Sequence, residues 1–533
     1  MNQSLRKWVK RLELPIVLLM LAALVWGYTQ GSEWSWNPDE IVKRVNWSLT
    51  GNYNFAGDFL YPTLPLYVMY ALGKWIYSLG LAEGYRQTLF FSAARWLSAG
   101  LGAASLLLVY LAARRLRPSG PAGLAALLLA AASPMLAVNA HYAHNDIYQL
   151  FFTCAALYLL VLYLLGKKQG WLYAAVFAVG LAASSKYTAG ILLPGALLAL
   201  ALVERGWKRL VPALALSVIV CYLGYALGTP LALLNPPYYF SSLLPALQFQ
   251  RSFGQLSQTS IGLVGQWEMM ARAFTPPMLF FWAAALAGSL IAAGRAWRAG
   301  LSEPLQRVRL VCAACILLLD LPIAQSYNYQ ERFFLPMLPF LALLGALLLL
   351  DCLSWMAQRP GWRFAAAGLL AASLGLTLYS AAGVVSITLL FKYEPRIAAG
   401  NYLRSQVVAG KTLEFTLYPP VIPDGYFKSA AAYPLFFKKA ADWEKTRDSD
   451  QGLAGITARS PDYLVVDSFT YQRYDFPEVC QVTPNDCAFF HNLLADKTPY
   501  RLLKTFHYEI PRFLPQLETA FLNPVIKIYQ RSP

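Results

Sequence analysis

Long apolar runs separated by short polar connections dominate the first 390 residues of the chain. Many of them approach the length of about 20 residues that a helix needs to cross the hydrocarbon core of a bilayer. The pattern therefore predicts an all-α membrane domain with about eleven spanning helices. Their expected ranges are 13–29, 90–113, 121–140, 147–165, 170–184, 188–204, 210–229, 276–295, 309–326, 333–353 and 364–390.

Basic residues alternate along the chain in step with these spans. Every second connection holds a cluster of Lys and Arg, and the short connections between them hold few. The clusters contain Arg6, Lys7, Lys10 and Arg11; Arg114, Arg115 and Arg117; Lys167 and Lys168; Arg205, Lys208 and Arg209; Arg295, Arg298, Arg307 and Arg309; and Arg359 and Arg363. The positive-inside rule places these clusters and the N-terminus in the cytoplasm, and the segment after the last span outside. No convincing cleavage site follows the first apolar run, so we interpret it as an uncleaved span.

The composition supports a membrane protein and excludes one alternative. Hydrophobic residues make up 57% of the chain and charged residues only 14%, whereas a soluble domain is typically about 25% charged. The net charge of +16 could suggest a nucleic-acid-binding protein. However, the basic residues are dispersed between apolar runs and form no single patch, so we expect no nucleic-acid partner and direct contact with membrane lipids.

Three regions are expected on the outer side. The first, about 30–89, contains the apolar stretch 64–79, which is amphipathic and broken by nearby prolines. We interpret this stretch as helices in the membrane interface, because a further crossing would reverse the side of every later basic connection. The second region, about 230–275, is rich in proline and aromatic residues. The third is the more polar tail, 391–533.

The tail is predicted to form a small α/β domain, separate from a membrane domain of residues 1–390. Residues 395–408 can form a helix, and 411–417 and 463–467 have strand patterns. Cys480 and Cys487 lie close together in this outer segment, where a disulfide would persist. A zinc site there would lack its other ligands.

Charged residues at the outer ends of the spans are the candidates for chemistry, because charge inside or beside a bilayer is costly. The acidic pair Asp39–Glu40 follows the first span, and His144 and Asp146 stand in the tight connection before the span at 147–165. Either acidic group could simply cap a helix. His144 and Asp146 also form a possible divalent metal site, although two ligands alone are weak evidence for one.

Two cationic residues are also expected at the outer ends of the spans. Lys186 lies between two short apolar segments, where it could extend to the interface or hold a lipid phosphate. Arg332 follows Tyr327 and Tyr329; it could pair with Glu331 or Asp320, or bind phosphate. Asp320 itself is expected to make a polar contact between helices. Acidic and cationic residues gathered on one aqueous face are harder to explain as caps alone.

The ordered set of motifs resembles GT-C-fold glycosyltransferases, and among them the protein O-mannosyltransferase and aminoarabinose transferase superfamily. The resemblance covers about residues 1–390. It is carried by the acidic pair after the first span, Tyr61-Pro-Thr-Leu-Pro65, Arg95 at the start of the next span, His141-Tyr-Ala-His-Asn-Asp146, Ser185-Lys-Tyr187 and Glu331-Arg-Phe-Phe-Leu-Pro336. Many relatives have Lys or His where this chain has Tyr61, so the side chain at this position cannot supply the cation that those relatives have.

The resemblance implies a function for each motif. Asp39 matches the catalytic base with Glu40 beside it, and Asp146 matches an acidic residue that shapes the site and binds a divalent metal in some relatives. Lys186 and Arg332 match positions near the carrier phosphate, and we place Tyr327 and Tyr329 with them. The expected donor is a polyprenyl-phosphate sugar, which agrees with the absence of a glycine-rich nucleotide loop. The expected reaction is a single displacement that inverts the sugar's anomeric carbon.

A lipid or sugar transporter is the alternative function, because it would also combine many spans with charged residues. Transporters usually contain related halves with broken helices, and the sequence has no evident half repeat. A lipid-linked oligosaccharide ligase or a non-catalytic membrane subunit would share much of the geometry. The Ala/Leu/Arg-rich composition favours a bacterial inner membrane. The acceptor, which could be a protein, a lipid or a glycan, is not indicated by the sequence.

Overall fold

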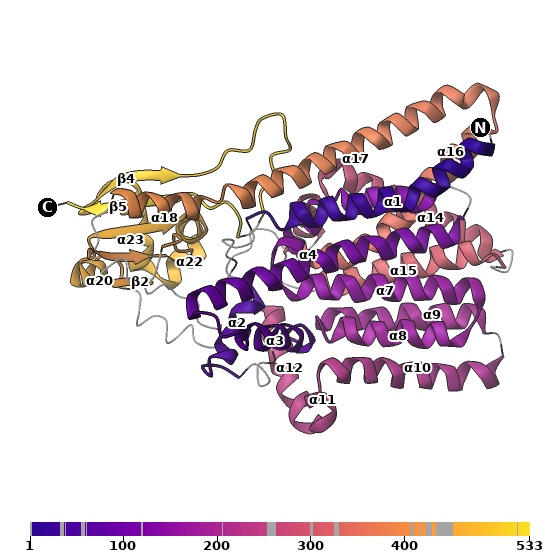
Figure 1. The fold of residues 1–533 in the computed structure, drawn as a ribbon, viewed down its shortest axis with the longest axis horizontal. Coiled ribbons are helices and arrows are strands. Elements are labelled where there is room, and N and C mark those ends of the chain that lie inside the picture. Colours follow the sequence, from indigo (N-terminus) through magenta and orange to yellow (C-terminus); the bar gives the residue numbers. More distant parts are fainter. Residues whose placement is uncertain are drawn as a thin grey trace.

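The computed structural model forms a helical bundle with a small α/β unit at one end (Figure 1). It describes residues 3–31, 37, 39–54, 59, 61–118, 121–204, 206–252, 263–298, 302–324, 330–406, 410–416, 418–422, 429–432, 451–519 and 521–532.

The bundle helices match the predicted apolar runs. They are α1 (Gln3–Tyr28), α4 (Glu83–Leu116), α5 (Ala122–Ala131) with α6 (Pro134–His141), α7 (Asn145–Gly166), α8 (Gln169–Ala183), 3₁₀ helix η2 (Tyr187–Leu192) with α9 (Leu193–Val203), α10 (Trp207–Gly228), α14 (Pro276–Arg298), α15 (Pro304–Ala324), 3₁₀ helix η3 (Glu331–Met337) with α16 (Leu338–Ala357), and, after the 3₁₀ turn η4 (Pro360–Trp362), α17 (Arg363–Lys392). Within the described residues, six helices are long and apolar enough to cross a membrane, or seven if the bent pair α5–α6 is one span. The chain is an integral membrane protein with mostly helical structure.

Short helices lie between the long ones in the first two regions that are predicted to lie outside. They are α2 (Ile41–Leu49), α3 (Leu64–Tyr77), α11 (Leu231–Leu234), α12 (Pro236–Ser252) and α13 (Leu263–Phe274). The 14 residues of α3 are too few to cross a hydrocarbon core, which takes about 20. Figure 1 shows α2, α3 and α11 at the end of the bundle that faces the α/β unit.

Two breaks in the helices position polar residues at that end. The axes of α5 and α6 differ by 66°; Pro134 lacks a backbone N–H, and the Ser133 hydroxyl caps α6 by accepting from the Leu136 N–H at 3.3 Å. The second break separates α8 from η2, where Lys186 has an extended backbone conformation. Close packing holds α8 against α10, because a Cβ added at Gly180 would overlap the backbone of Cys221.

The basic connections gather at the opposite end of the bundle. Arg117 and Arg309 come from two different connections, and both form ion pairs with Asp351 near the end of α16. Glu13 of α1 accepts a hydrogen bond from Tyr110 and lies 3.8 Å from Arg114. The charge separation that the sequence predicts is thus present between the two ends, while which end faces the cytoplasm stays a prediction.

The C-terminal unit is built on a five-stranded sheet. Its order is β2-β1-β3-β5-β4, in which β1 pairs in parallel with β2 and β3, and β5 pairs antiparallel with β3 and β4. The strands are β1 (Thr412–Phe415), β2 (Ser429–Ala432), β3 (Tyr463–Asp467), β4 (Tyr500–Phe506) and β5 (Ile526–Arg531). All five residues of β3 are buried, as expected for a central strand with both faces covered.

Helices cover both faces of this sheet. On one face α18 (Pro395–Gln406) packs through Ala399 and Leu403, and on the other a second apolar cluster includes residues of α20 and α23. The helices after α18 are α20 (Gly452–Arg459), α21 (Ser468–Tyr471), 3₁₀ helix η7 (Gln472–Asp475), α22 (Pro477–Val482) and α23 (Pro484–Leu494). A disulfide joins Cys480 and Cys487. His491 lies beside them, but bonded sulfurs cannot act as thiolate ligands for a metal.

Candidate active site

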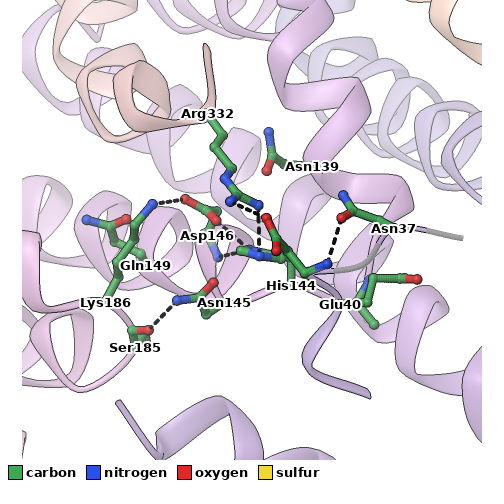
Figure 2. Close-up of polar contacts among 12 residues, drawn as sticks. Asn37, Glu40, Asn139, His144, Asn145, Asp146, Gln149, Ser185, Lys186 and Arg332 are labelled. Carbon is green, nitrogen blue, oxygen red and sulfur yellow. Dashed lines mark hydrogen bonds and ion pairs between the residues drawn. The ribbon is translucent and has the colours of Figure 1, made fainter. Parts of the chain in front are cut away.

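Five charged or titratable residues from four predicted motifs meet at the bundle end beside the α/β unit. Figure 2 shows four of them, His144, Asp146, Lys186 and Arg332. Asp39 lies between α1 and α2, His144 and Asp146 lie at the start of α7, Lys186 precedes η2, and Arg332 lies in η3. The sequence thus identified residues that the fold brings together, although Asp39 and Arg332 are 293 positions apart.

These five side chains form a continuous polar chain. Arg332 donates from Nη2 to Asp39 Oδ2 at 2.7 Å, and its Nη1 lies 2.9 Å from His144 Nε2. His144 Nδ1 contacts Asp146 Oδ2, and Asp146 Oδ1 pairs with Lys186 Nζ at 2.5 Å. Two carboxylates and two cations therefore alternate around one histidine.

The contacts of His144 involve both of its ring nitrogens. Arg332 can only donate hydrogen bonds, so the Nε2 that it contacts must accept. Nδ1 faces the Asp146 carboxylate, to which it can donate, and lies 3.4 Å from the Asp146 backbone N–H, from which it can accept as the N-cap of α7. Burial and the neighbouring Arg332 lower the pKa of His144, although Asp146 opposes them. A neutral His144 that relays contact between Arg332 and Asp146 agrees with all of these observations.

Asp39 is ionised and partly accessible in this arrangement. Burial acts to raise the pKa of Asp39, but the charge and hydrogen bond of Arg332 hold it below its ordinary value. Its side chain is 29% exposed, and those of Arg332 and Lys186 are 16% and 17% exposed, whereas Asp146 is fully buried. A ligand can thus reach one carboxylate and both cations. Asp146 is out of reach of a ligand, and it contacts Lys186 directly and Arg332 through His144.

Glu40 has a different environment from its neighbour. Both of its carboxylate oxygens accept from Arg95, at 2.9 and 2.8 Å, and Oε1 also accepts from the Ala143 N–H at 3.0 Å. The Glu40 side chain is fully buried and that of Arg95 is 2% exposed. This bidentate pair joins the loop of Asp39 to α4 and to the connection before α7, and leaves Glu40 no oxygen free to meet a substrate.

The cap alternative holds for the second motif, where His144 is the N-cap residue of α7 and accepts from the Asp146 N–H at 3.4 Å, and it is wrong for the acidic pair. Glu40 occupies the N-cap position of α2 but makes no side-chain cap bond, and Asp39 uses its carboxylate on Arg332. Pairing of Arg332 with Glu331 or Asp320, one of the alternatives for this residue, is also not found, since Arg332 pairs with Asp39. Asp320 instead accepts from Gln266, a contact between α15 and α13. The other predicted members of the site, Tyr327 and Tyr329, lie outside the described residues.

Aromatic groups border the two cations. The Lys186 ammonium lies 4.4 Å from the ring centroid of Phe333. The Arg44 guanidinium of α2 lies 4.6 Å from the ring centroid of Tyr61, whose edge faces His144. A cation is therefore present beside Tyr61, supplied by an arginine that the motif comparison did not single out.

The residues considered for a metal do not fit one. Each Asp146 oxygen already faces Lys186 or His144, and the second nitrogen of His144 faces Arg332. Two cations within the same chain of contacts would repel a divalent ion. Among the described residues, three potential ligand side chains come together at Cys480, Cys487 and His491 in the α/β unit, but the two sulfurs there are joined in a disulfide.

A small pocket adjoins the chain of charges. Its lining comprises Asn37, Met135, Val138, Asn139, Tyr142, His144, Gln330, Glu331, Arg332, Thr519 and Phe521. Sequence reasoning did not assign the last two, because single Thr and Phe residues in a polar tail carry no motif. Asn37 positions the loop of Asp39, since its Oδ1 accepts from the Asp39 N–H at 2.9 Å and its carbonyl accepts from Lys43 at 3.1 Å.

Comparison with known proteins found one family match and similar solved structures. Residues 72–226 match the family described as dolichyl-phosphate-mannose-protein mannosyltransferase. Among solved structures, ArnT from Cupriavidus metallidurans bound to undecaprenyl phosphate has a TM-score of 0.50 at 16% identity, over 97% of this chain and 98% of that one. The apo form of that protein has a TM-score of 0.51 at 15% identity, with the same coverage. No curated protein sequence matches.

The chain has a GT-C fold. The resemblance to the protein O-mannosyltransferase and aminoarabinose transferase superfamily is confirmed by the family match and the fold. In this GT-C chain the matched residues 72–226 run from the last part of α3 into α10 and contain His144, Asp146 and Lys186. Asp39 and Arg332 join the site from outside the matched region.

Proposed function

We propose that this protein is a membrane glycosyltransferase that moves a sugar from a polyprenyl-phosphate carrier to an acceptor on the extracytoplasmic face. The observation that carries the proposal is the chain from Asp39 through Arg332, His144 and Asp146 to Lys186. It places a carboxylate that can take a proton beside cations that can hold a phosphate. The match to mannosyltransferases and the undecaprenyl phosphate bound by ArnT support a donor of this class.

The charge balance suggests how the donor enters. Asp39 and Asp146 are matched by Arg332 and Lys186, so these four charges cancel before the donor binds. A carrier phosphodiester brings a negative charge to the partly exposed cations. Arg332 then divides its donors between the phosphate and Asp39, because a guanidinium has five N–H groups in a fixed fork.

The chemical step is a single displacement. The acceptor hydroxyl gives its proton to Asp39 as its oxygen attacks the anomeric carbon, and the bond from that carbon to the carrier phosphate oxygen breaks. The carrier leaves as a phosphate monoester, whose additional negative charge Arg332 and Lys186 stabilise. Attack opposite the leaving phosphate inverts the anomeric configuration, and no covalent enzyme intermediate forms.

The remaining residues position these groups. Asp146 holds Lys186 directly and Arg332 through His144, while Glu40 and Arg95 hold the loop that carries Asp39. We therefore assign Glu40 and Asp146 positioning roles. Residues 1–390 form the catalytic membrane domain in this proposal, and 391–533 form an extracytoplasmic domain of a protein in a bacterial inner membrane.

The test is carrier release by the purified protein. It is incubated with undecaprenyl-phosphate hexoses and pentoses and a mixture of hydroxyl acceptors, and free undecaprenyl phosphate is measured by mass spectrometry. We expect release from at least one donor, and loss of release in Asp39→Asn. Asp351→Asn is the matched control, since it removes a carboxylate paired with arginine at the other end of the bundle. An Asp39→Asn protein as active as the wild type would refute the assignment of the base.

A further inference from the structure

A loop of the C-terminal unit lies against the side of the membrane bundle. The chain leaves the sheet after β4, runs back along α17 and returns before β5 (Figure 1, yellow). Asn523 closes the loop: it donates to the Tyr508 carbonyl at 2.9 Å and accepts from the Tyr508 N–H at 3.2 Å. We call residues 510–517 the loop tip. Ile510 is buried in the main apolar core of the bundle, so the tip packs as a part of the membrane domain.

Contacts with α17 give the depth of the loop tip. Ser386 donates to the Pro515 carbonyl at 2.9 Å, and a Cβ added at Gly383 would lie 3.1 Å from the Leu517 side chain. At a rise of about 1.5 Å per residue, Gly383 lies about 13 Å below Lys392, the last residue of α17. This helix belongs to a segment long and apolar enough to cross a membrane. The loop tip therefore lies beside a spanning helix, well below its end.

The end of α17 that carries Lys392 lies at the level of the candidate active site. Phe391 stacks on His141, with ring centroids 4.0 Å apart, and His141 belongs to the motif that contains His144. The charged side chains of the site belong at the membrane interface, because charge is costly in the hydrocarbon core. A segment that extends from this level toward the middle of α17 thus enters the leaflet on that side.

The loop tip lies on a side of the bundle that faces lipid. Leu374, Leu378 and Val385 of α17 are exposed, as expected for apolar side chains of a span that contact acyl chains. Phe513 of the loop tip is 86% exposed. Leaving so much aromatic surface in water is unfavourable, whereas aromatic rings insert readily at the boundary between headgroups and acyl chains.

The backbone of the loop tip suits an environment with little water. Pro511 and Pro515 have no N–H that needs a partner. The Gln516 side-chain amide donates to the Pro511 and Leu514 carbonyls, at 3.2 and 3.0 Å. The Leu514 N–H donates to the Pro511 carbonyl at 2.9 Å. Unpaired backbone groups are what keeps most loops out of a membrane, and these contacts pair much of the backbone of the loop tip.

We propose that the loop tip is a membrane anchor: Phe513 inserts into the leaflet beside α17 and holds the C-terminal unit against the membrane. Two charged neighbours limit the depth. Arg512 is exposed and can keep its guanidinium among the headgroups while its stem lies along apolar surface. The exposed Glu518 carboxylate also belongs at that level. The ring therefore lies about 5–10 Å into the boundary between headgroups and acyl chains.

The anchor is independent of the proposed reaction, yet it acts on the site. Thr519 and Phe521 of the same loop line the pocket beside the charged chain. Arg396 of α18 donates to the Phe521 carbonyl at 3.4 Å, which fixes the loop on the side of the C-terminal unit. Insertion of Phe513 fixes its other side in the membrane.

The test measures the depth of position 513 by fluorescence quenching. Phe513→Cys and Ala458→Cys are labelled with NBD, a dye whose emission moves to shorter wavelength away from water, and the full chain is reconstituted in phosphatidylcholine vesicles. Ala458 is the matched control, since it is an exposed residue of α20, which lies on the side of the α/β unit far from the bundle (Figure 1). Lipids with a nitroxide on carbon 5 or carbon 12 report shallow or deep contact. Labelling of the native cysteines is measured on the wild type and subtracted.

We expect emission at shorter wavelength from position 513 than from position 458, with most of it lost to the carbon-5 nitroxide and less to the carbon-12 nitroxide. The dye at position 458 should keep its emission with both lipids. Identical, unquenched emission from the two positions would show that the ring stays in water. Emission shifted at position 513 but unquenched by either lipid would show that a protein partner or a second copy covers it. Stronger quenching from carbon 12 would contradict the interfacial depth. Each of these three results overturns the inference.

Discussion

Replacing Arg332 by alanine tests whether its guanidinium acts on both the proposed base, Asp39, and the leaving phosphate. The guanidinium contacts Asp39 at 2.7 Å and His144 at 2.9 Å, and we assign it the leaving phosphate as well. A preorganised charged contact to the transition state contributes about 3–4 kcal/mol, so Arg332→Ala should lower kcat about 100- to 1,000-fold. Arg332→Lys keeps the charge without the fork and should lose less.

The pH profile of the same variant separates the two roles. In the wild type Arg332 lowers the pKa of Asp39 against the effect of burial, so the base is protonated, and the rate falls, only at low pH. Without Arg332, burial raises that pKa, so the acidic limb of the profile should move to higher pH.

The assay is the initial rate of undecaprenyl phosphate release at saturating donor, measured across the acidic and neutral range. Arg117→Ala is the control, since it removes an arginine paired with Asp351 at the opposite end of the bundle and should leave kcat and the pH profile unchanged. An Arg332→Ala enzyme with wild-type kcat would refute the role in the transition state. A reduced kcat with an unmoved acidic limb would show that Arg332 does not control Asp39.

Three further predictions concern the residues around this centre. Lys186→Ala should raise KM for the lipid donor about 10-fold or more through loss of a charged contact; unchanged donor kinetics would count against its phosphate role. Glu40→Gln should destabilise the protein by about 3–5 kcal/mol, because it leaves the buried Arg95 charge uncompensated; a thermal unfolding midpoint in detergent equal to that of the wild type would contradict this. Treatment with EDTA followed by removal of the chelator should leave the rate unchanged, because Lys186 and Arg332 face the two residues considered for a metal; a rate restored only by a divalent cation would show that the ion belongs to the site.

The sequence predicted much of the bundle because the bilayer restricts the choices. A span must be long, apolar and helical, so α7, α10 and α14 could be located from runs of Leu and Ala. The charged residues at the site could be identified for the same reason. Charged residues are rare in so apolar a chain, and Asp39, Lys186 and Arg332 lie at the ends of its spans. Their proximity to one another was suggested by their equal depth and by the family resemblance.

The pairings could not be predicted, because they depend on the packing of helices far apart in the chain. Glu331 is the sequence neighbour of Arg332, yet Asp39 is its partner. The sequence did not predict that Thr519 and Phe521 line the pocket, for a different reason. Their part in the pocket comes from a loop that docks through ordinary apolar residues such as Ile510 and Leu522, and no motif marks such a contact.

The anomeric configuration of the product tests the central claim most directly. The account requires one displacement, in which Asp39 takes the proton of the acceptor while Arg332 and Lys186 take the charge of the departing phosphate. The product made from a donor of known configuration is examined by NMR before any spontaneous change. We predict inversion at the anomeric carbon. Retention would contradict the account, since it would require a nucleophile on the enzyme and two displacements in place of one.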